Sequence, residues 1–201
     1  KGVGIYLSLL LYPTDRGADA TRLTARAAVA LARAVEETSG LSPNIKWVND
    51  LVVGNKKLCG ILTEMSVVGE SGEADNVVIG IGINVNQKGE DFPEEIRKIA
   101  TSLSLETGKE QNRAKLCALL TEKLDKLVKD FPTDKEYYLS EYRKSCAILG
   151  KKIRIIKNGE QRTGTAADID DNFGLEVEFD DGKKETVTGG EVSVRGFYGY
   201  I

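Results

Sequence analysis

Hydrophobic and polar positions alternate over short stretches through most of the chain, which is typical of strands. Residues 3–12 form a short apolar run that Pro13 closes, and this predicts a buried strand. The run NVVIGIGINVN at 76–86 is the clearest strand, because its isoleucines and Val85 alternate onto one face. The opposite face carries two glycines and two asparagines, Gly80, Gly82, Asn84 and Asn86.

Three longer stretches follow a helical period instead. In residues 20–39, apolar side chains recur at spacings of 3 and 4 with arginines on the opposite face, and Gly40 ends the helix. Residues 112–131 carry a leucine-rich stripe, and residues 134–147 repeat the pattern more weakly. We expect a further short helix within residues 94–103.

Between the helix at 20–39 and the strand at 76–86, short apolar runs are separated by turns. Residues 44–48, 51–53 and 57–66 read as strands, separated by the Asn49–Asp50 turn and by a tight Gly54–Asn55 hairpin. We also expect a turn at Glu70–Glu73 before the next strand.

The character of the chain changes near residue 149. From there on, turn signals recur at intervals of roughly ten residues, which favours a small all-β barrel. The tight turns are Asn158–Gly159 and Asp181–Gly182. We therefore predict two domains, residues 1–148 and residues 149–201.

The amino-acid composition excludes several classes of partner and of catalytic or metal site. The 201 residues are 41% hydrophobic and 29% charged with a net charge of −3, so the chain has no overall attraction to nucleic acid or anionic membranes. No apolar run approaches the roughly 20 residues that span a bilayer. Three widely spaced cysteines argue against disulfides and a zinc site, and fit a reducing cytoplasm. The absence of histidine excludes histidine-dependent triads and histidine metal sites.

The polar positions between residues 46 and 84 are candidates for a binding site. Glycine weakens a strand, so the glycines at 80 and 82 indicate either a closely approaching ligand or tight packing of a sheet on a helix. Gly60 and Leu62 share a strand face over which a flat apolar ligand could lie, and Lys57 could neutralise its anionic end. Taken alone, a lysine beside a turn is usually a solvated charge, and an Asn-Asp pair usually satisfies a turn.

Together these pieces are more specific. Lys-Trp-x-Asn-Asp from residue 46, Lys-Leu-x-Gly-Ile-Leu-x-Glu from residue 57, and Gly-x-Gly-Ile-Asn from residue 80 resemble the catalytic domain of biotin protein ligases. Residues 3–11 are similar to the strand that follows the biotin-binding loop in that family. The GGEVSVR stretch at 189–195 is similar to the end of its SH3-like domain. Val48 departs from the proline that is usual there.

The resemblance implies an α+β fold, with a mixed sheet packed against helices as in class II aminoacyl-tRNA synthetases, followed by a small SH3-like barrel. It implies an ATP-dependent biotin–[acetyl-CoA-carboxylase] ligase. Biotin and MgATP form biotinyl-5'-AMP, and a lysine of a biotin carboxyl carrier protein then displaces AMP. It implies no tightly bound metal and no protein metal ligands.

The resemblance also assigns roles. Lys57 and Asp50 would be catalytic, with Lys57 contacting the biotin carboxylate and the phosphate and Asp50 orienting the incoming lysine. The biotin pocket would comprise Lys57, Gly60, Leu62, Gly80, Gly82 and Ile83. The ATP and adenylate contacts would be Asn49, Lys57, Asn84 and Arg195.

The family's glycine- and arginine-rich loop does not occur within residues 1–201, so we expect this chain to be a fragment that is inactive by itself. Alternatives are a lipoate-protein ligase, which shares the acyl-adenylate chemistry, and a biotin-sensing transcriptional repressor in the full-length protein. A third is that the β-rich tail is a binding module of its own, although its many acids disfavour nucleic acid. A homodimer is an expectation carried by the resemblance, and neither nucleic acid nor membrane is an expected partner of this stretch.

Overall fold

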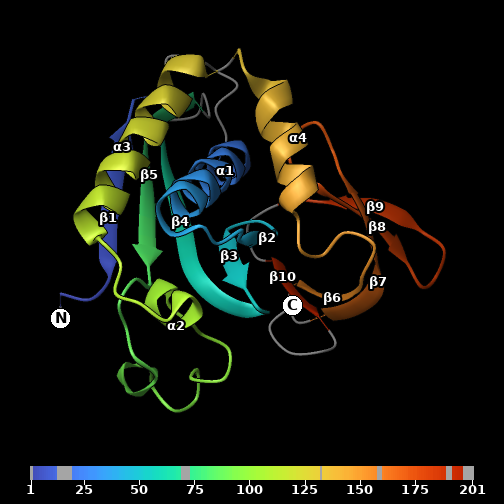
Figure 1. Ribbon diagram of the computed structural model, residues 1–201. Coiled ribbons are helices and arrows are strands. Elements are labelled where there is room, and N and C mark those ends of the chain that lie inside the picture. The colour runs from blue at the N-terminus through green and yellow to red at the C-terminus, as the bar shows by residue number, and fades with distance from the viewer. Residues whose placement is uncertain are drawn as a thin grey trace.

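The computed structural model describes residues 2–12, 20–68, 73–131, 133–157, 160–188 and 192–196. The first half of the chain builds a five-stranded sheet in the order β1-β5-β4-β3-β2 (Figure 1). All strand pairs in it are antiparallel, and parallel pairing occurs between the described residues only in two isolated bridges. The strands are β1 (Ile5–Leu11), β2 (Asn44–Lys46), β3 (Asp50–Val53), β4 (Lys56–Val68) and β5 (Glu73–Ile83).

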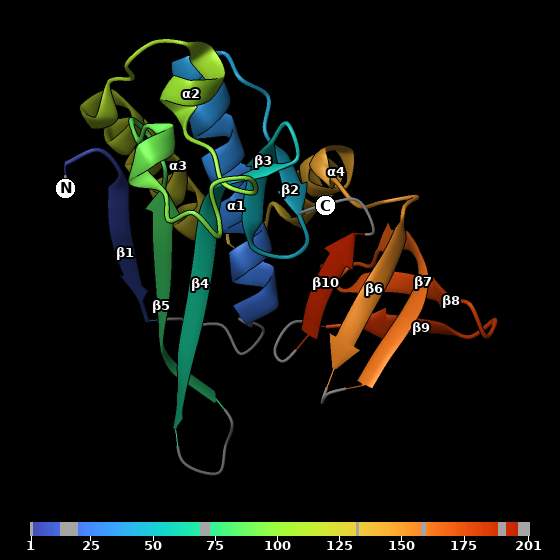
Figure 2. The same cartoon turned by 90° about the horizontal axis from the view of Figure 1, so that it is seen from below.

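Helices cover one face of this sheet. Helix α1 contacts β4 and is itself packed against α3 and α4, and both views place these helices on the same side (Figures 1 and 2). The helical elements are α1 (Ala20–Ser39), the short 3-10 helix η2 (Gly89–Asp91), α2 (Leu103–Thr107), α3 (Arg113–Asp130) and α4 (Lys135–Ser145).

Helix α1 is buried on more sides than its amphipathic pattern indicates. Its apolar residues Leu31, Ala34 and Val35 are fully buried, as expected. Arg26 was expected on the solvent face, but it is only 4% exposed, with its guanidinium 4.5 Å from the ring centre of Phe131. The reason is that α3 and α4 cover the side of α1 that faces away from the sheet.

The other face of the first sheet bears the glycines. Along β5, Ile79, Ile81 and Ile83 are at most 2% exposed against the helices, as the alternation predicts. Strand β1 follows the same alternation, because Ile5 is buried whereas Tyr6 is 84% exposed. The sheet therefore has one face packed in the core and one open face.

The second sheet comes from the C-terminal part of the chain. Its strands are antiparallel in the order β10-β6-β7-β8-β9, and they lie beside α4 and the β2–β3 region (Figure 2). Their inward residues alternate with exposed ones, as in the pattern of β8. The strands are β6 (Lys152–Lys157), β7 (Glu160–Ile169), β8 (Leu175–Phe179), β9 (Lys184–Val187) and β10 (Val192–Gly196).

The prediction of a helix within residues 94–103 is wrong. Residues 94–99 form turns, and the helix that follows is α2, which begins after Ser102 and ends at Thr107, with Gly108 as its C-cap. The Ser102 side chain accepts from the N–H of Leu105 and caps this helix, and Gly108 has a φ of 71°. Most of the expected Glu70–Glu73 turn and the Asn158–Gly159 turn lie outside the described residues.

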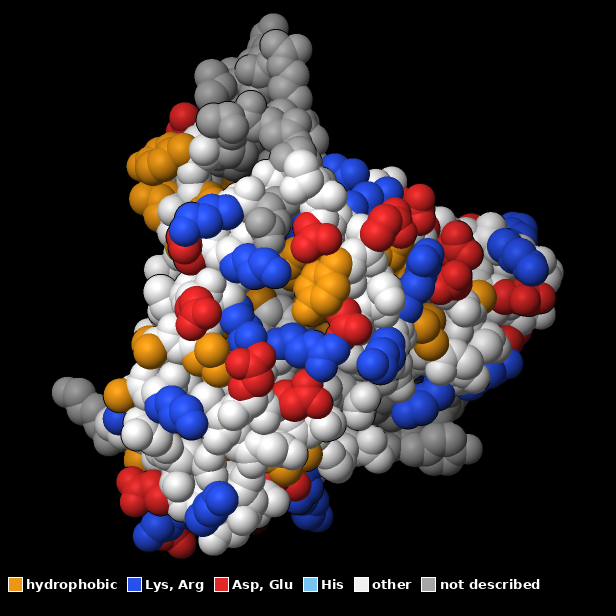
Figure 3. Space-filling model, turned by 45° about the horizontal axis from the view of Figure 1, so that its top comes forward, with side chains coloured by type: hydrophobic (Ala, Val, Ile, Leu, Met, Phe, Trp, Pro, Cys, Tyr) orange, Lys and Arg blue, Asp and Glu red, His pale blue; other side chains and the backbone are white. Residues whose placement is uncertain are grey.

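The surface carries charges of both signs. Figure 3 shows basic and acidic side chains interspersed over one face of the molecule, in keeping with the net charge of −3. Within the described part of the chain, no helix is both long and apolar enough to cross a membrane.

Candidate functional site

The Trp47–Asn49 turn between β2 and β3 is fastened to β4. The side-chain amide of Asn49 donates to the carbonyl of Ile61 at 2.8 Å, and the Ile61 N–H donates to the Asn49 carbonyl at 2.9 Å. The Trp47–Val48 peptide bond is cis. These contacts fix the place at which Asp50 begins the next strand.

Lys57 stands near the start of β4 and is held by the loop that precedes α2. Its backbone N–H donates to the Ile99 carbonyl at 2.7 Å, and its carbonyl accepts from the Thr101 N–H at 2.9 Å. Its ammonium lies 2.6 Å from Oδ1 of Asp50. The Asp50 side chain is only 12% exposed, whereas the Lys57 side chain is 39% exposed, so water reaches the pair from the lysine side.

Gly60 makes this ion pair possible. It lies opposite Asp50 in the sheet, and a Cβ placed on it would be 3.1 Å from both Cε and Nζ of Lys57. The same Cβ would be 3.4 Å from Oδ1 of Asp50. Glycine at this position therefore lets the lysine side chain lie across the strand toward Asp50.

Beside this ion pair, the open face of the sheet is lined mainly by glycines, so few side chains rise from it. In register, Gly60 is paired with Gly82, which is paired with Tyr6 on the edge strand. One step further, Leu62 is paired with Gly80. A Cβ on Gly82 would be 3.7 Å from the Tyr6 ring, and one on Gly80 would be 3.6 Å from the Leu62 carbonyl. A flat ligand can thus approach the backbone closely here.

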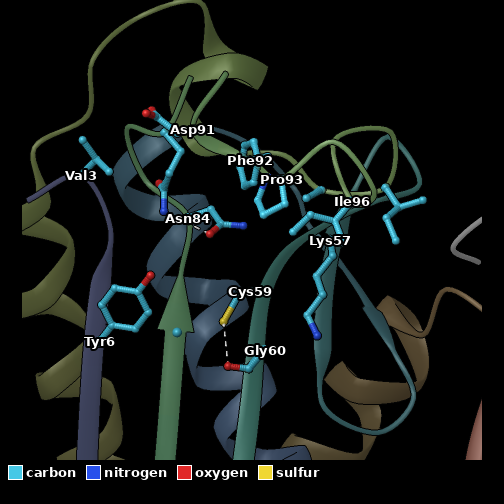
Figure 4. A pocket seen from close by; sticks show the side chains of 14 residues that line it. Val3, Tyr6, Lys57, Cys59, Gly60, Asn84, Asp91, Phe92, Pro93 and Ile96 are labelled. Carbon is cyan, nitrogen blue, oxygen red and sulfur yellow. Dashed lines mark hydrogen bonds between the residues drawn. The ribbon is translucent and has the colours of Figure 1, made fainter. Parts of the chain in front are cut away.

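Two cavities open on this face and meet at the ion pair. The first has a volume of about 630 Å³ and extends under the loop of residues 87–100, and the second has a volume of about 480 Å³ and lies over β1, β5 and β4. Figure 4 shows Tyr6 and Lys57 on either side of Gly60, below Phe92 and Pro93. The residues shared by the two cavities are Tyr6, Lys57, Gly60 and Gly82.

Most of the residues that the sequence singled out line these cavities. Asn84 lies in the first, and Asn49, Leu62 and Gly80 lie in the second. Leu62 is 62% exposed, as expected of a side chain on the open face. Asp50 reaches the site through its contact with Lys57.

The Ile83 side chain lies away from the cavities, and the Arg195 side chain lies outside the part of the chain that the structure describes. Ile83 lines neither cavity, because it follows Gly82 on the strand and its side chain, 1% exposed, points into the core. Arg195 lies in β10, opposite Arg154 of β6, and its side chain is not among those that the structure describes. The contact of Arg195 with ATP therefore stays a prediction.

Sequence reasoning missed the wall above the sheet. Gln87, Phe92, Pro93 and Ile96 line the first cavity, and they lie in or before the stretch 94–103 for which the sequence predicts only a short helix. The available signal was the apolar Phe92-Pro93 pair inside a polar stretch, where nothing in the local pattern requires an apolar residue.

Cys59 also lines the first cavity but is not a reactive thiol. Burial raises its pKa well above the ordinary value, the charge of Asp50 raises the pKa further, and Lys57 opposes the shift. A protonated thiol is a poor nucleophile at neutral pH. The chemistry of the site is therefore that of Lys57, Asp50, amide groups and the backbone.

Comparison with known proteins gives matches along most of the chain. Residues 1–84 match the biotin/lipoate A/B protein ligase family, and residues 148–195 match the biotin protein ligase C terminal domain. The bifunctional ligase/repressor BirA of Bacillus subtilis is 37% identical over 186 residues, which are 92% of this chain and 57% of the relative. The chain thus spans little more than half of that relative's length.

Solved structures agree with the sequence matches. The apo structure of biotin protein ligase from Aquifex aeolicus superposes with a TM-score of 0.84 at 28% identity, covering 96% of this chain and 83% of that one. The complex of the Aquifex aeolicus enzyme with biotin and ATP superposes with a TM-score of 0.83 at 27% identity, covering 96% and 79%. These proteins share the arrangement of both sheets with the chain.

Proposed function

Because the chain belongs to the biotin protein ligase family, we propose that it carries the adenylate-forming centre of an ATP-dependent biotin ligase. The observation that carries the proposal is the position of Lys57 where the two cavities meet. The second cavity suits a flat ring lying on glycines. The first cavity has the apolar wall and the polar groups that suit a nucleotide. Both substrates are anionic, and the cation stands between them.

In the proposed first step, the biotin ring lies over Gly60, Gly80 and Gly82, and its carboxylate reaches Lys57. A carboxylate oxygen attacks the α-phosphorus of ATP, a C–O–P mixed anhydride forms, and the bond to pyrophosphate breaks. Lys57 lowers the repulsion between the two anions and stabilises the charge of the transferring phosphoryl group. Mg²⁺ enters with the nucleotide as MgATP, a substrate. In the described residues, no group of three or more metal-ligating side chains is assembled.

The proposed nucleotide end lies under the 87–100 loop. The ring of Phe92 and the side chain of Ile96 supply an apolar surface for the base, and Asn84 supplies a polar group. Asn49 lies in the second cavity beside Lys57, with its side chain already donating to the Ile61 carbonyl. Asn49 therefore presents its amide oxygen, or its second N–H, to the adenylate.

In the second step, the amine of an acceptor lysine attacks the carbonyl carbon of the anhydride. The C–N bond forms, AMP leaves with the electron pair of the C–O bond, and the nitrogen loses a proton. Asp50 holds Lys57 across Gly60 and so orients the catalytic cation. An uncharged amine must be the nucleophile, and Asp50 is our candidate for orienting the incoming lysine and helping it lose its proton. This further role of Asp50 stays a prediction.

The acceptor is proposed to be a lysine of a biotin carboxyl carrier protein, such as that of acetyl-CoA carboxylase. We further propose that residues 1–148 form the catalytic unit and residues 149–201 an SH3-like domain. The match of the C-terminal family to residues 148–195 supports this division. A cytoplasmic location, a homodimer, inactivity of the isolated chain and the contact of Arg195 with ATP remain predictions.

Titration calorimetry with biotin and with lipoate tests the proposal, using the complete gene product that contains residues 1–201. We expect biotin to bind, lipoate to bind at least about tenfold more weakly, and pyrophosphate release to require both biotin and MgATP. Tighter binding of lipoate, or pyrophosphate release that depends on lipoate, would assign the site to lipoyl transfer instead.

A further inference from the structure

The start of α3 holds the segment that enters β1. Arg113 is the first residue of this helix, and its guanidinium donates from Nε to the Gly4 carbonyl at 3.0 Å and from Nη1 to the Gly2 carbonyl. Between these two residues, the Val3 carbonyl accepts from the backbone N–H of Asn86 at 2.8 Å. Three successive carbonyl groups ahead of β1 are thus held by donors that lie far away in the sequence.

Asn86 joins the same helix start to the end of β5. Its Nδ2 donates to the Gln111 carbonyl at 3.0 Å, and its Oδ1 accepts from the Gln111 N–H at 2.8 Å. A backbone N–H can only donate and a backbone carbonyl can only accept, so the Asn86 amide cannot turn over without losing both bonds. Residues 111–113 therefore hold both the entrance of β1 and the stretch that follows β5.

The two segments held in this way form part of the wall of the first cavity. Val3 lines the cavity from the first segment, and Asn84 and Gln87 line it from the second. Figure 4 shows Val3 and Lys57 on opposite sides of the cavity, with Asn84 between them. A Cβ on Gly4 would be only 2.9 Å from Nε2 of Gln87, so the two segments lie in direct contact.

The helix itself gives no reason for an arginine at its first position. A cation there lies at the positive end of the helix dipole, which disfavours it. The guanidinium, however, donates from separate nitrogens in a rigid fork, so it holds Gly2 and Gly4 at the same time. The ammonium of a lysine has a single nitrogen and would hold the two carbonyls less well. The contacts with the entrance of β1 therefore account for Arg113.

We propose that Arg113 and Asn86 are positioning residues for the nucleotide, forming a clamp that keeps Val3 and the end of β5 together as one wall of the first cavity. This inference rests on the proposed function, in which that cavity holds ATP. Neither residue of the clamp is among those that line the two cavities, so the clamp acts through the wall. The wall contacts ATP in the ground state and in the transition state alike, so its loss raises the KM for ATP and leaves kcat nearly unchanged.

The first test measures biotin-dependent pyrophosphate release by the complete gene product as MgATP is varied at saturating biotin. Arg113→Met keeps much of the side-chain length but has no donor. We expect the KM for ATP to rise at least about tenfold in Arg113→Met and about threefold in Arg113→Lys, with kcat within about threefold of the wild type. The matched control is Lys115→Met, which removes an exposed cation from the same turn of α3 and should keep the wild-type KM.

Calorimetry with biotin separates the two cavities. The second cavity, where the biotin ring is proposed to lie, is lined in β1 by Tyr6, Leu7 and Ser8, which follow the clamped segment. We therefore expect the Kd for biotin of Arg113→Met to stay within about threefold of the wild type.

The second arm of the clamp is tested by Asn86→Ala, which loses both bonds to Gln111. We expect the KM for ATP to rise at least about threefold. Because both side chains hold one wall, freeing either end loses much of the same contact. The double variant of Arg113→Met and Asn86→Ala should therefore raise the KM by less than the product of the two single factors.

Thermal melting of each variant accompanies these assays. A folded Arg113→Met protein whose KM for ATP equals that of Lys115→Met would show that the arginine only stabilises the fold and would refute the inference. A lower kcat at an unchanged KM would refute it as well. If Arg113→Met does not fold, Arg113→Lys and Asn86→Ala decide by the same comparison. A wild-type protein that releases no pyrophosphate from ATP with biotin would instead overturn the proposed function on which the inference rests.

Discussion

The indole nitrogen of Trp47 donates to the backbone carbonyl of Phe173 at 2.9 Å, and this bond joins the turn of the first sheet to a hairpin of the second. Phe173 is fully buried and has a φ of 63°, which is uncommon for a bulky residue. Its ring packs edge-on against Tyr142, whose hydroxyl donates to the Val48 carbonyl at 3.2 Å. The segment that delivers Asn49 and Asp50 to the site thus rests on contacts with the C-terminal sheet.

Loss of these contacts should destabilise the protein in a graded way. Tyr142→Phe removes one hydroxyl donor to a part-buried carbonyl, and we expect it to lower the free energy of unfolding by about 1 kcal/mol. Trp47→Phe removes a donor and also leaves a cavity, so a loss of about 2–4 kcal/mol is expected. Urea denaturation measures both. The matched control is Tyr137→Phe, whose residue is 44% exposed, and a Tyr142→Phe protein no less stable than this control would contradict the account.

Gly60→Ala should impair catalysis without unfolding the protein. Its methyl group would stand 3.1 Å from Cε and Nζ of Lys57, so the flexible lysine must move away from Asp50. We expect adenylate formation to fall about 10–100-fold, because the cation is no longer held at the junction of the cavities. Gly89→Ala is the control, since nothing lies within 4 Å of the added atom. Equal activity of the two variants would show that the space above Gly60 is not needed.

Gly80→Ala should affect binding rather than stability. The added methyl group meets the Leu62 carbonyl at an ordinary 3.6 Å, so the folded protein tolerates it. The same group rises from the floor of the second cavity, where the biotin ring is proposed to lie. We expect the Kd for biotin, measured by calorimetry, to rise at least about tenfold while the melting temperature stays within a few degrees. Unchanged affinity would place biotin elsewhere.

Cys59 should make the protein less stable at alkaline pH. Burial raises the pKa of the folded-state thiol, whereas in the unfolded chain the thiol ionises near its usual value of about 8.5. Above that pH the unfolded state releases a proton that the folded state retains, so the free energy of unfolding falls as pH rises, by at most about 1.4 kcal/mol per pH unit for this thiol.

Denaturation curves between pH 7.5 and pH 9.5 measure this dependence. Cys59→Ala should lose that part of the slope, while Cys117→Ala, which alters a partly exposed thiol, should keep it. A Cys59→Ala protein with an unaltered slope would show that the thiol ionises equally easily in the folded state.

Periodicity alone was sufficient to predict the strand that carries Gly80 and Gly82. The alternation of residues 76–86 predicted that Gly80 and Gly82 share a face opposite the buried isoleucines, because successive side chains of a strand point to opposite sides. The same rule excludes the Ile83 side chain from that face, and only the resemblance to a family had placed it in the pocket. The helix end at Gly40 and the turn at Gly54 were also predicted from the sequence. Both glycines have positive φ values, as such positions require.

Long-range relationships were not readable from local pattern. The Lys57–Asp50 pair depends on the β3–β4 register, which is shifted between Leu51 and Val52. The 94–99 turns contain local hydrogen bonds, such as that from the Ala100 N–H to the Ile96 carbonyl, but their place beside β4 is set by the bond from the Lys57 N–H to the carbonyl of Ile99, which is 42 residues away and therefore absent from any local window. For that reason the sequence did not predict the wall above the sheet that lines the first cavity.

The central claim is that Lys57 stands between the biotin carboxylate and the α-phosphate. The most direct measurement is biotin-dependent pyrophosphate release from MgATP by Lys57→Ala and by the matched variant Lys56→Ala, in the complete gene product and with thermal melting as a check of folding. Lys56 is exposed and lines neither cavity, so its variant should retain wild-type rates. We predict that Lys57→Ala loses about 10²–10³-fold in kcat while keeping the fold. A folded Lys57→Ala protein that forms adenylate as fast as Lys56→Ala would contradict the account.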